Sequence, residues 1–443
     1  MNICIIGAGY VGLVTGACFA DRGHHVTCVD SDPAKIDSIC RGVAPFHEGG
    51  LDQLLARNIG HRLLAQTTLE SAVAKADLVL ICVGTPFRGD QIDLSQVINA
   101  AEQIGRCLVN ATRYKVVVVK STVIPGTTNG AVLETLERTS GLQAGKDFGL
   151  GMNPEFLTEG CAVDDFMSPD RIVIGGIDKR TQEVLLSVYE GWPETPRVLT
   201  NNSTAEMIKY TSNSVLAMLI SFSNEIARLC SAVGSVDVVD VMNGVHKSAY
   251  FTRRLPDGQT VVAPITSFLG AGCGFGGSCL PKDVSALVAQ GKTYGLEMQL
   301  LQSVLDINRG QPDHFIKLAD KHYPSMGGVK VAILGLAFKP DTDDVRESPA
   351  FPIISMLKKR GAIIKAYDPV ARPIEHPDMA GVELVETLID AVSDVEIIFI
   401  VTRWAEFTQL SGVLRALGRD PLVVDGRRLL NPDGFRRFEG IGR

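Results

Sequence analysis

A glycine-rich turn near the start of the chain constrains the fold more than any other feature. The residues Gly7-Ala8-Gly9-Tyr10-Val11-Gly12 follow the apolar run Ile3–Ile6 and precede a helix-like stretch, and the next apolar run ends at Asp30. This context is typical of a dinucleotide-binding βαβ unit, in which glycines let the backbone approach a pyrophosphate at a helix N-terminus. Asp30 can accept hydrogen bonds from the ribose hydroxyls and would repel a 2′-phosphate, so the pattern favours NAD over NADP. The alternative is a glycine turn that only packs a helix on a strand.

The chain has 443 residues, enough for about three domains at about 150 residues each. Apolar strand-like runs alternate with helix-like stretches up to about residue 200; the runs are Ile3–Ile6, His25–Val29, Leu78–Val83, Lys115–Val119 and Arg171–Ile174. A long helical pattern with Met207, Tyr210, Ser214, Met218 and Phe222 on one stripe covers Ser203–Val233. A second alternating set opens at Lys330–Leu334 and continues with strand-like runs near Ile363–Tyr367, Val395–Val401 and Leu422–Val424. We therefore expect an α/β fold with two doubly wound parts, divided into 1–200, a helical connector at 201–311, and 312–443.

Charge and composition exclude several functions. There are 43 Lys plus Arg and 50 Asp plus Glu, a net charge of −7, which argues against nucleic-acid or anionic-membrane binding. The N-terminus has no export signal, and no apolar run approaches the ~18 residues of a membrane span. We expect a cytoplasmic protein with reduced thiols. The ten cysteines have no metal-ligand spacing, so we expect no metal site and one reactive thiol among buried ones.

Two segments should lie where parallel strands open into the cofactor crevice. Cys82-Val83-Gly84-Thr85-Pro86 and Lys120-Ser121-Thr122-Val123 both follow apolar runs and offer small or hydroxyl residues. The expected cofactor contacts here are Val83, Gly84, Thr85, Ser121 and Thr122. Lys35 could reach a cofactor phosphate or ribose, although a solvated helix lysine is an equal alternative.

A second glycine-rich loop precedes Cys279. The sequence Gly274-Phe275-Gly276-Gly277-Ser278-Cys279 continues into a helix-like stretch with Asp283 one turn on. A thiol at a helix start has a lowered pKa and can act as a nucleophile, whereas a cysteine taken at random is usually a buried hydrophobe. The carboxylate of Asp283 would order a water or a neighbouring lysine rather than activate the thiol directly.

Two further polar sets are candidates for proton transfer. Glu155 follows a proline-marked turn and is a candidate acid or base, while Glu159 could simply start or cap a helix. Glu206, Lys209 and Asn213 form a polar stripe on the long helix. Because the helix is nearly free of charge from Tyr210 to Asn224, we expect Lys209 to point into a partly buried place rather than into solvent.

Seven motifs in order resemble those of the nucleotide-sugar 6-dehydrogenases, the UDP-glucose and GDP-mannose dehydrogenase family. They are GAGYVG with Asp30, CVGTP, KSTVIPGT, NPEFLTEG, EMIKYTSN, GFGGSCLPKD and GLAFKPDTDDVRESP, and they span nearly the whole chain. The resemblance implies two Rossmann-like domains joined by a long helix, the first for NAD and the second for the nucleotide of the sugar. It also implies a four-electron oxidation of the sugar C6 alcohol to a carboxylate, most simply on UDP-glucose, with two NAD reduced.

The resemblance also implies roles for individual residues. Cys279 would form a thiohemiacetal and then a thioester, Lys209 and Asn213 would stabilise charge on the C6 oxygen, and Glu155, Asp283 and Thr122 would serve proton transfer and the hydrolytic water. Further cofactor contacts implied are Gly7, Gly9, Tyr10, Val11, Gly12, Glu159, Lys282 and Arg346. Implied substrate contacts are Glu155, Phe156, Leu157, Thr158, Lys209, Asn213, Phe268, Leu269, Gly272, Phe275, Gly276, Phe338, Lys339 and Arg427.

The chain departs from many UDP-glucose enzymes near the nucleophile. Leu280 replaces a Phe, and the stretch His246–Arg254 replaces a short loop with an Arg-Ile-Gly segment. Arg253 or Arg254 would take the place of the missing arginine, and both remain candidates for substrate contact. GDP-mannose or a UDP-N-acetylhexosamine is therefore an alternative substrate; a two-electron 2-hydroxy-acid dehydrogenase and a non-catalytic binding protein are alternatives of other kinds. A homodimer through the long helix is expected by resemblance.

Overall fold

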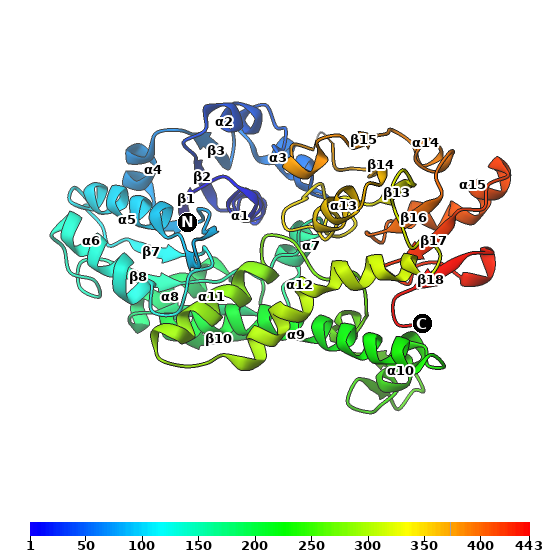
Figure 1. The fold of residues 1–443 in the computed structure, drawn as a ribbon. Coiled ribbons are helices and arrows are strands. Elements are labelled where there is room, and N and C mark those ends of the chain that lie inside the picture. Colours follow the sequence, from blue (N-terminus) through cyan, green and yellow to red (C-terminus); the bar gives the residue numbers. More distant parts are fainter. Residues whose placement is uncertain (373) are drawn as a thin grey trace. The chain divides into compact units, whose positions relative to one another are not determined.

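The chain divides into two compact units. The computed structural model describes residues 1–372 and 374–443, and the division falls between unit 1, Met1–Ser212, and unit 2, Asn213–Arg443. Figure 1 shows each unit as a sheet with helices packed around it.

Unit 1 is built on an eight-stranded sheet in the order β10-β9-β8-β7-β4-β1-β2-β3. The strands are β1 (Asn2–Ile6), β2 (His25–Val29), β3 (Leu63–Gln66), β4 (Leu78–Ile81), β7 (Val116–Val119), β8 (Gly149–Met152), β9 (Ile172–Gly176) and β10 (Arg197–Thr200). The six strands from β3 to β8 run parallel, in the order of a dinucleotide-binding sheet. The expected α/β class is confirmed, and each strand expected in this unit lies within two residues of its predicted bounds.

The last two strands of this sheet reverse direction, which the sequence pattern did not indicate. β9 pairs antiparallel with β8, and β10 runs parallel to β9. The connection from β8 to β9 contains only α7 (Ala162–Met167), which at 1.5 Å per residue extends about 9 Å. A five-residue strand spans about 16 Å, so this connection lacks a helix long enough to return the chain along the sheet.

Helices cover both faces of the unit 1 sheet. They are α1 (Tyr10–Asp21), α2 (Pro33–Cys40), α3 (Leu51–Asn58), α4 (Leu69–Lys75), α5 (Ser95–Leu108), α6 (Leu133–Ser140), α7 and α8 (Lys179–Val188), with a π-helical turn at Thr128–Val132 and a small hairpin of β5 (Phe87–Arg88) and β6 (Gln91–Ile92). Ile3 and Ile5 of β1 pack with α1, α3 and α8, while Cys4 and Ile6 pack with α4, α5 and α6. This alternation buries both faces, as a parallel sheet requires.

Unit 2 contains a second, fully parallel sheet in the order β15-β14-β13-β16-β17-β18. Its strands are β13 (Lys330–Leu334), β14 (Ile363–Tyr367), β15 (Glu383–Leu384), β16 (Ile397–Ile400), β17 (Leu422–Asp425) and β18 (Phe438–Gly440), and its helices include α13 (Ala350–Lys359), α14 (Leu388–Val392) and α15 (Leu410–Leu417). Four of these strands were expected. The short strands β15 and β18, at the two edges, were not.

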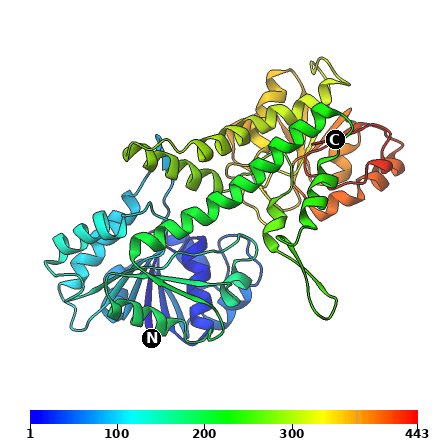
Figure 2. The same ribbon diagram turned by 90° about the horizontal axis from the view of Figure 1, so that it is seen from below.

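Helices before this sheet complete unit 2. They are α10 (Val238–His246), α11 (Leu280–Thr293) and α12 (Gln299–Asp320), and a two-stranded hairpin of β11 (Thr252–Arg254) and β12 (Thr260–Val262) follows α10. Figure 2 shows this hairpin extending away from the rest of unit 2. Helix α9 (Asn202–Val233) spans the division between the units. The predicted boundary at 200/201 falls between β10 and α9, and the one at 311/312 falls inside α12, so the three-part division stays a prediction.

Helix α9 has the length and composition of a membrane span. Among the described residues it is the one helix that meets that criterion, with a third of its most apolar window buried. The interior helix of a water-soluble protein meets the same criterion. Two residues buried on α9, Glu206 and Lys209, have ionisable side chains.

Candidate functional site

The glycine turn after β1 has the geometry of a pyrophosphate cradle. Gly7 has φ +96 and its N–H donates to Val29 O at 2.8 Å. A Cβ on Gly12 would lie 1.8 Å from Gly7 O, whereas a Cβ on Gly9 would meet no atom within 4 Å. Gly12 therefore lets helix α1 pack against the turn, and the open space at Gly9 suits close approach by a phosphate group.

Asp30 lies at the end of β2, beside this turn. Its carboxylate accepts from Ala8 N–H at 2.8 Å, from Asp32 N–H at 3.0 Å and from Lys35 Nζ at 3.0 Å. Partial burial raises the pKa of Asp30, but the hydrogen bonds from Asp32, Lys35 and Ala8 outweigh it and the pKa lies below its usual value. Asp30 is therefore a carboxylate at neutral pH, and Lys35 is an ion-pair partner of that carboxylate rather than a purely solvated lysine.

The side chain of Tyr10 is engaged away from the glycine turn. Its hydroxyl donates to Glu48 and accepts from Gly160 N–H at 2.7 Å. If Tyr10 contacts a cofactor, its backbone N–H at the start of α1 is the group in place to do so. Glu48 was missed by the sequence analysis, because nothing in the pattern around it indicates a binding residue.

Glu48 also accepts hydrogen bonds at the start of the helix that follows Glu159. Helix α7 begins at Ala162 after Cys161, and Glu48 accepts from Ala162 N–H at 2.8 Å and Gly160 N–H at 2.7 Å. A carboxylate at these N–H groups satisfies donors that the helix leaves unpaired. Glu159 lies in the preceding turn, so it does not start α7.

The two segments expected at the carboxyl edge of the sheet do lie together. Thr85 Oγ1 donates to Thr122 O at 2.7 Å, and Ser121 Oγ donates to Val83 O at 2.7 Å. Both segments follow neighbouring strands, β4 and β7, on the edge that also holds the Gly7 turn. This is the edge where doubly wound sheets bind ligands.

Glu155 and Lys209 form a buried ion pair. Lys209 Nζ lies 3.0 Å from Glu155 Oε1, with the two side chains 5% and 7% exposed, and Leu157 N–H donates to Glu155 Oε2 at 2.6 Å. Burial raises the pKa of Glu155, but the facing ammonium and this N–H outweigh it, so the pKa lies below its usual value. Lys209 thus points into a buried place, as the sequence analysis expected, and Phe156 lies beside it with Lys209 Nζ 5.4 Å from the ring centroid.

Lys120 is a buried residue near this pair to which the sequence pattern assigns no role. It follows β7, and its Nζ donates to Asn153 Oδ1 at 3.0 Å; Tyr189 donates to the same oxygen at 2.6 Å. Burial lowers the pKa of Lys120 from its usual value. Asn153 is two residues before Glu155, so this network holds the turn that presents Glu155. Thr158, the exposed end of that turn, is held by Asp165, which accepts from its N–H at 2.8 Å.

In unit 2, Cys279 sits at the start of α11 as its N-cap residue, with Ser278 Oγ 3.5 Å from its sulfur. Asp283, one turn on, is buried and accepts from Asn213 Nδ2 at 2.6 Å and from Lys282 Nζ at 2.5 Å. The expected ordering of a neighbouring lysine by Asp283 is therefore present. All ten cysteines are in the thiol form, and among the described residues no group of three or more His, Cys, Asp or Glu is placed to hold a metal ion.

The loop before Cys279 lies against two other predicted segments of unit 2. A Cβ on Gly277 would lie 2.7 Å from the Phe338 ring, and one on Gly276 would lie 2.1 Å from Glu347 O. Arg427 donates to Gly274 O at 3.1 Å and to Val401 O at 2.5 Å. Three motifs far apart in the sequence thus meet here.

The remaining predicted residues of unit 2 are more scattered. Arg346 pairs with Asp344 at 2.7 Å, and Lys339 follows Phe338 in a partly buried turn. Gly272 and Leu269 are buried, Phe268 is half-buried, and Arg253 and Arg254 are exposed on β11. Arg253 and Arg254 therefore lie in an exposed hairpin, whereas Leu269 and Gly272 lie in a buried part of the chain.

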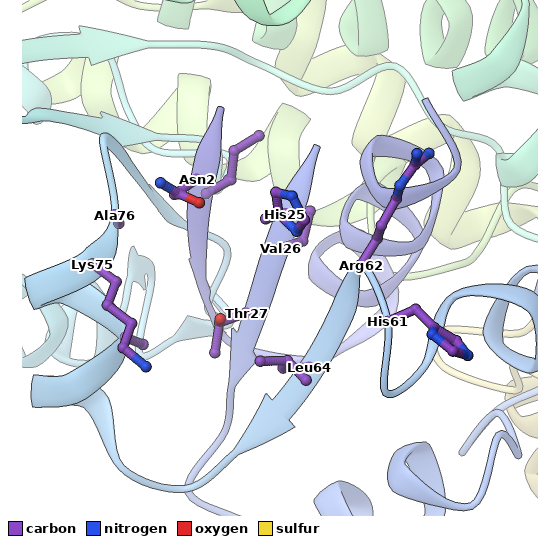
Figure 3. A pocket seen from close by; sticks show the side chains of 11 residues that line it. Asn2, His25, Val26, Thr27, His61, Arg62, Leu64, Lys75 and Ala76 are labelled. Carbon is purple, nitrogen blue, oxygen red and sulfur yellow. The ribbon is translucent and has the colours of Figure 1, made fainter. Parts of the chain in front are cut away.

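A cavity of about 180 Å³ lies elsewhere in unit 1. Asn2, His25 and Arg62 line it (Figure 3), at or beside the first residues of β1, β2 and β3. It is therefore at the amino edge of the sheet, opposite the edge that holds the Gly7 turn. None of the predicted site residues lines it.

Comparison with known proteins agrees with this geometry along the whole chain. Residues 1–193 match the NAD binding domain of the UDP-glucose/GDP-mannose dehydrogenase family, 203–310 its central domain and 332–432 its UDP binding domain. The chain therefore belongs to the UDP-glucose/GDP-mannose dehydrogenase family, and unit 1 contains its NAD-binding domain.

Individual relatives match over nearly their full length. The UDP-glucose 6-dehydrogenase of Rhizobium meliloti is 40% identical, with all of both chains covered. The UDP-glucose 6-dehydrogenase AglM of Haloferax volcanii is 38% identical over all of this chain and 99% of its own. A solved UDP-glucose dehydrogenase from Pyrobaculum islandicum is 37% identical, with a TM-score of 0.89 over 99% of this chain and 97% of that one.

Proposed function

We propose that the protein is an NAD-dependent UDP-glucose 6-dehydrogenase. It would convert UDP-glucose, two NAD and one water into UDP-glucuronate, two NADH and three protons. The observation that carries the proposal is Cys279 at the start of α11, presented by a buried glycine loop with the clamped carboxylate of Asp283 one turn on. The full-length similarity to proteins named as UDP-glucose 6-dehydrogenases supports the same substrate.

The residues of unit 1 fit NAD. The turn at Gly9 leaves space for a phosphate, Gly12 admits the helix N-terminus, and Asp30 is an ionised acceptor beside the turn. The remaining contacts proposed are Gly7, Tyr10, Val11, Lys35, Val83, Gly84, Thr85, Ser121, Thr122, Glu159, Lys282 and Arg346. Two NAD molecules, bound one after the other, would each accept one of the two hydrides that the four-electron oxidation releases.

For the first oxidation we assign Lys209 to the C6 oxygen of the sugar. Its ammonium is buried, and a positive charge in a dry environment stabilises a developing alkoxide strongly. Glu155 is an ionised carboxylate in contact with that ammonium, so it can accept a proton and pass it to a water, which Thr122 would help to hold.

For the second oxidation we assign Cys279 as the nucleophile. Its sulfur would add to the aldehyde carbon while the carbonyl oxygen takes a proton, giving a thiohemiacetal whose oxidation leaves a thioester. A water then attacks the thioester carbon, the C–S bond breaks and the thiolate returns. Asp283 would orient this water, and Asn213, which donates to Asp283, would donate its second N–H to the sugar oxygen.

Unit 2 would bind the nucleotide of the substrate. Phe338 and Lys339, which follow β13, and Arg427, which lies against the glycine loop, would contact the uridine diphosphate, since guanidinium and ammonium groups suit a diphosphate. The other proposed contacts are Glu155, Phe156, Leu157, Thr158, Arg253, Arg254, Phe268, Leu269, Gly272, Phe275 and Gly276. A UDP-N-acetylhexosamine or GDP-mannose is the alternative substrate, because the hairpin that carries Arg253 and Arg254 departs from the usual loop.

We further propose a cytoplasmic homodimer. Met207, Phe222, Leu229 and Val233 form a stripe on α9 at helical spacing and are 43%, 48%, 61% and 57% exposed. A second copy of the same helix could cover such a stripe, because a two-fold interface pairs a surface with itself. Ten cysteines in the thiol form fit a reducing compartment.

The decisive experiment is a panel of UDP- and GDP-sugars assayed for NADH release. UDP-glucose should give the highest kcat/KM and two NADH per sugar. One NADH per sugar would support a two-electron dehydrogenase instead, and no NADH with retained ligand binding would support a non-catalytic protein. Cys279→Ser should abolish release of the uronic acid, and release at the parent rate would refute Cys279 as the nucleophile.

A further inference from the structure

Three side-chain amides hold the loop that leads to Cys279. Gly272 N–H donates to Asn224 Oδ1 at 2.8 Å, and Gly272 O accepts from Gln311 Nε2 at 2.7 Å. Three residues on, Asn308 accepts from Phe275 N–H at 2.8 Å and donates to Phe275 O at 3.0 Å. Asn308 therefore pairs with both polar groups of one loop residue, as a neighbouring strand would.

Asn308 also explains the glycine beside Phe275. Gly274 has φ +106, and a Cβ on it would lie 2.8 Å from Asn308 Oδ1. The amide occupies the space that a side chain at 274 would fill. The glycine and the asparagine are thus two parts of one contact.

On its other side the same loop is pressed against backbone. A Cβ on Gly276 would lie 2.1 Å from Glu347 O, and Gly277 N–H donates to Arg346 O at 3.0 Å. The loop therefore lies between Asn308 and the segment 346–348. Removal of the Asn308 amide would leave the loop in contact with the segment 346–348 on one side only. Cys279 follows these loop residues directly in the sequence.

A proline interrupts the backbone hydrogen bonding of helix α12 at the turn that carries Asn308. Pro312 lies inside the helix and has no N–H to donate to the carbonyl of Asn308, four residues back. Arg228 of α9 donates to Ile307 O at 2.8 Å and to Gln311 Oε1 at 2.9 Å. Hydrogen bonds from Arg228 of α9 thus hold this turn of α12 on both sides of Asn308 and fix the position of Asn308.

We propose that Asn308 is a positioning residue for the nucleophile: it fixes Phe275 and so places the Cys279 thiol where it captures the aldehyde. The inference rests on the proposed function, in which Cys279 attacks that aldehyde. A displacement of about 1 Å of a reacting group can cost about a hundredfold in rate. Loss of Asn308 should slow capture of the aldehyde more than its formation, because Lys209 and Glu155, which serve the first oxidation, belong to unit 1.

The test counts NADH per UDP-glucose in three variants, with a hydrazine present to trap released aldehyde. Asn308→Ala removes both hydrogen bonds, and Asn308→Asp keeps an acceptor for Phe275 N–H while losing the donor to Phe275 O. Arg309→Ala is the matched control, since Arg309 is exposed on the same helix and pairs with Asp306 at 2.8 Å. The rate of Cys279 alkylation by iodoacetamide and the KM for NAD are measured alongside.

We expect NADH per sugar to fall from two toward one in both Asn308 variants, with trapped aldehyde, an altered alkylation rate and a KM for NAD within threefold of the parent. Arg309→Ala should keep two NADH per sugar. A lower kcat with two NADH per sugar and unchanged alkylation would overturn the proposal, since it indicates a merely structural role. If Asn308→Ala does not fold, Asn308→Asp decides alone. A parent protein that gives fewer than two NADH per sugar refutes the proposed function instead.

Discussion

The buried pair of Glu155 and Lys209 predicts that removal of the lysine costs more stability at pH 7 than at pH 5. Lys209→Met replaces the ammonium by an apolar chain of similar length. It leaves the carboxylate of Glu155, 7% exposed, with a hydrogen bond from the N–H of Leu157. Removal of one partner of a buried ion pair costs about 3–5 kcal/mol because the other charge stays buried. Glu155 can escape that cost by taking up a proton.

The free energy needed to protonate Glu155 sets the size of the expected loss of stability. For the usual glutamate pKa of 4.5, protonation costs about 3.4 kcal/mol at pH 7 and about 0.7 kcal/mol at pH 5, at about 1.36 kcal/mol per pH unit. In the variant the folded carboxyl binds more protons than the unfolded one, so stability falls as pH rises above 4.5. In the parent the folded pKa is lowered, so the pair's contribution is present above pH 4.5 and is lost as pH falls below it.

The assay follows unfolding of unit 1 in urea by fluorescence. The sequence has two tryptophans, so a Trp404→Phe background leaves only Trp192, which is buried in the core of unit 1. We expect Lys209→Met to lose about 3 kcal/mol at pH 7 and less than about 1 kcal/mol at pH 5. The double variant Lys209→Met/Glu155→Gln should recover most of the loss at pH 7. Lys146→Met, at an exposed site, is the matched control and should change little.

Equal destabilisation of Lys209→Met at both pH values would refute this reasoning. It would mean that the lost stability comes from packing of the lysine chain rather than from a stranded carboxylate. Failure of the double variant to recover would lead to the same conclusion.

Three further predictions test other parts of the structure. Gly12→Ala should cost about 1–3 kcal/mol through overpacking, because its Cβ meets backbone, whereas Gly9→Ala should keep the parent Tm and raise the KM for NAD at least tenfold. Phe222→Asp on α9 should convert a dimer into a monomer by light scattering, and an unchanged mass would contradict the proposed interface. Asp394, whose pKa the hydrogen bond from Lys365 lowers to about 2, should stabilise the fold above pH 4, so the difference between parent and Asp394→Asn should shrink as pH falls from 4 to 2.

The parts of the site that the sequence could predict are those set by local backbone chemistry. The Gly7 turn with Asp30 and the loop before Cys279 can each be recognised from residues that are close together in the sequence. Apolar runs also predicted the exact bounds of β2 and β13. Glu48 and Asn308 were not predictable in this way. Their contacts join residues 112 and 33 positions apart, and a single sequence has no local signal for such pairs.

Helix α9 illustrates the same limit. The spacing of Met207, Tyr210 and Phe222 predicted one apolar stripe, yet Tyr210 is buried while Met207 and Phe222 are 43% and 48% exposed. Periodicity locates a helix but does not say which face a neighbour covers when both faces are apolar. The face that stays exposed can be recognised only once the fold is known, and the proposed homodimer rests on it.

The two sheets also show why one fold binds a dinucleotide and its repeat does not do so in the same way. Gly335, after β13, has φ +96 and donates to Tyr367 O at 2.8 Å, as Gly7 does to Val29 O. Asp368, after β14, corresponds to Asp30. Its carboxylate, however, is fully buried and accepts from the N–H groups of Leu336, Ala337, Val370 and Ala371 and from Trp404 Nε1. Because those donors occupy it, Asp368 has no access to a ribose, and a nucleotide on unit 2 must be recognised by other residues of that sheet edge.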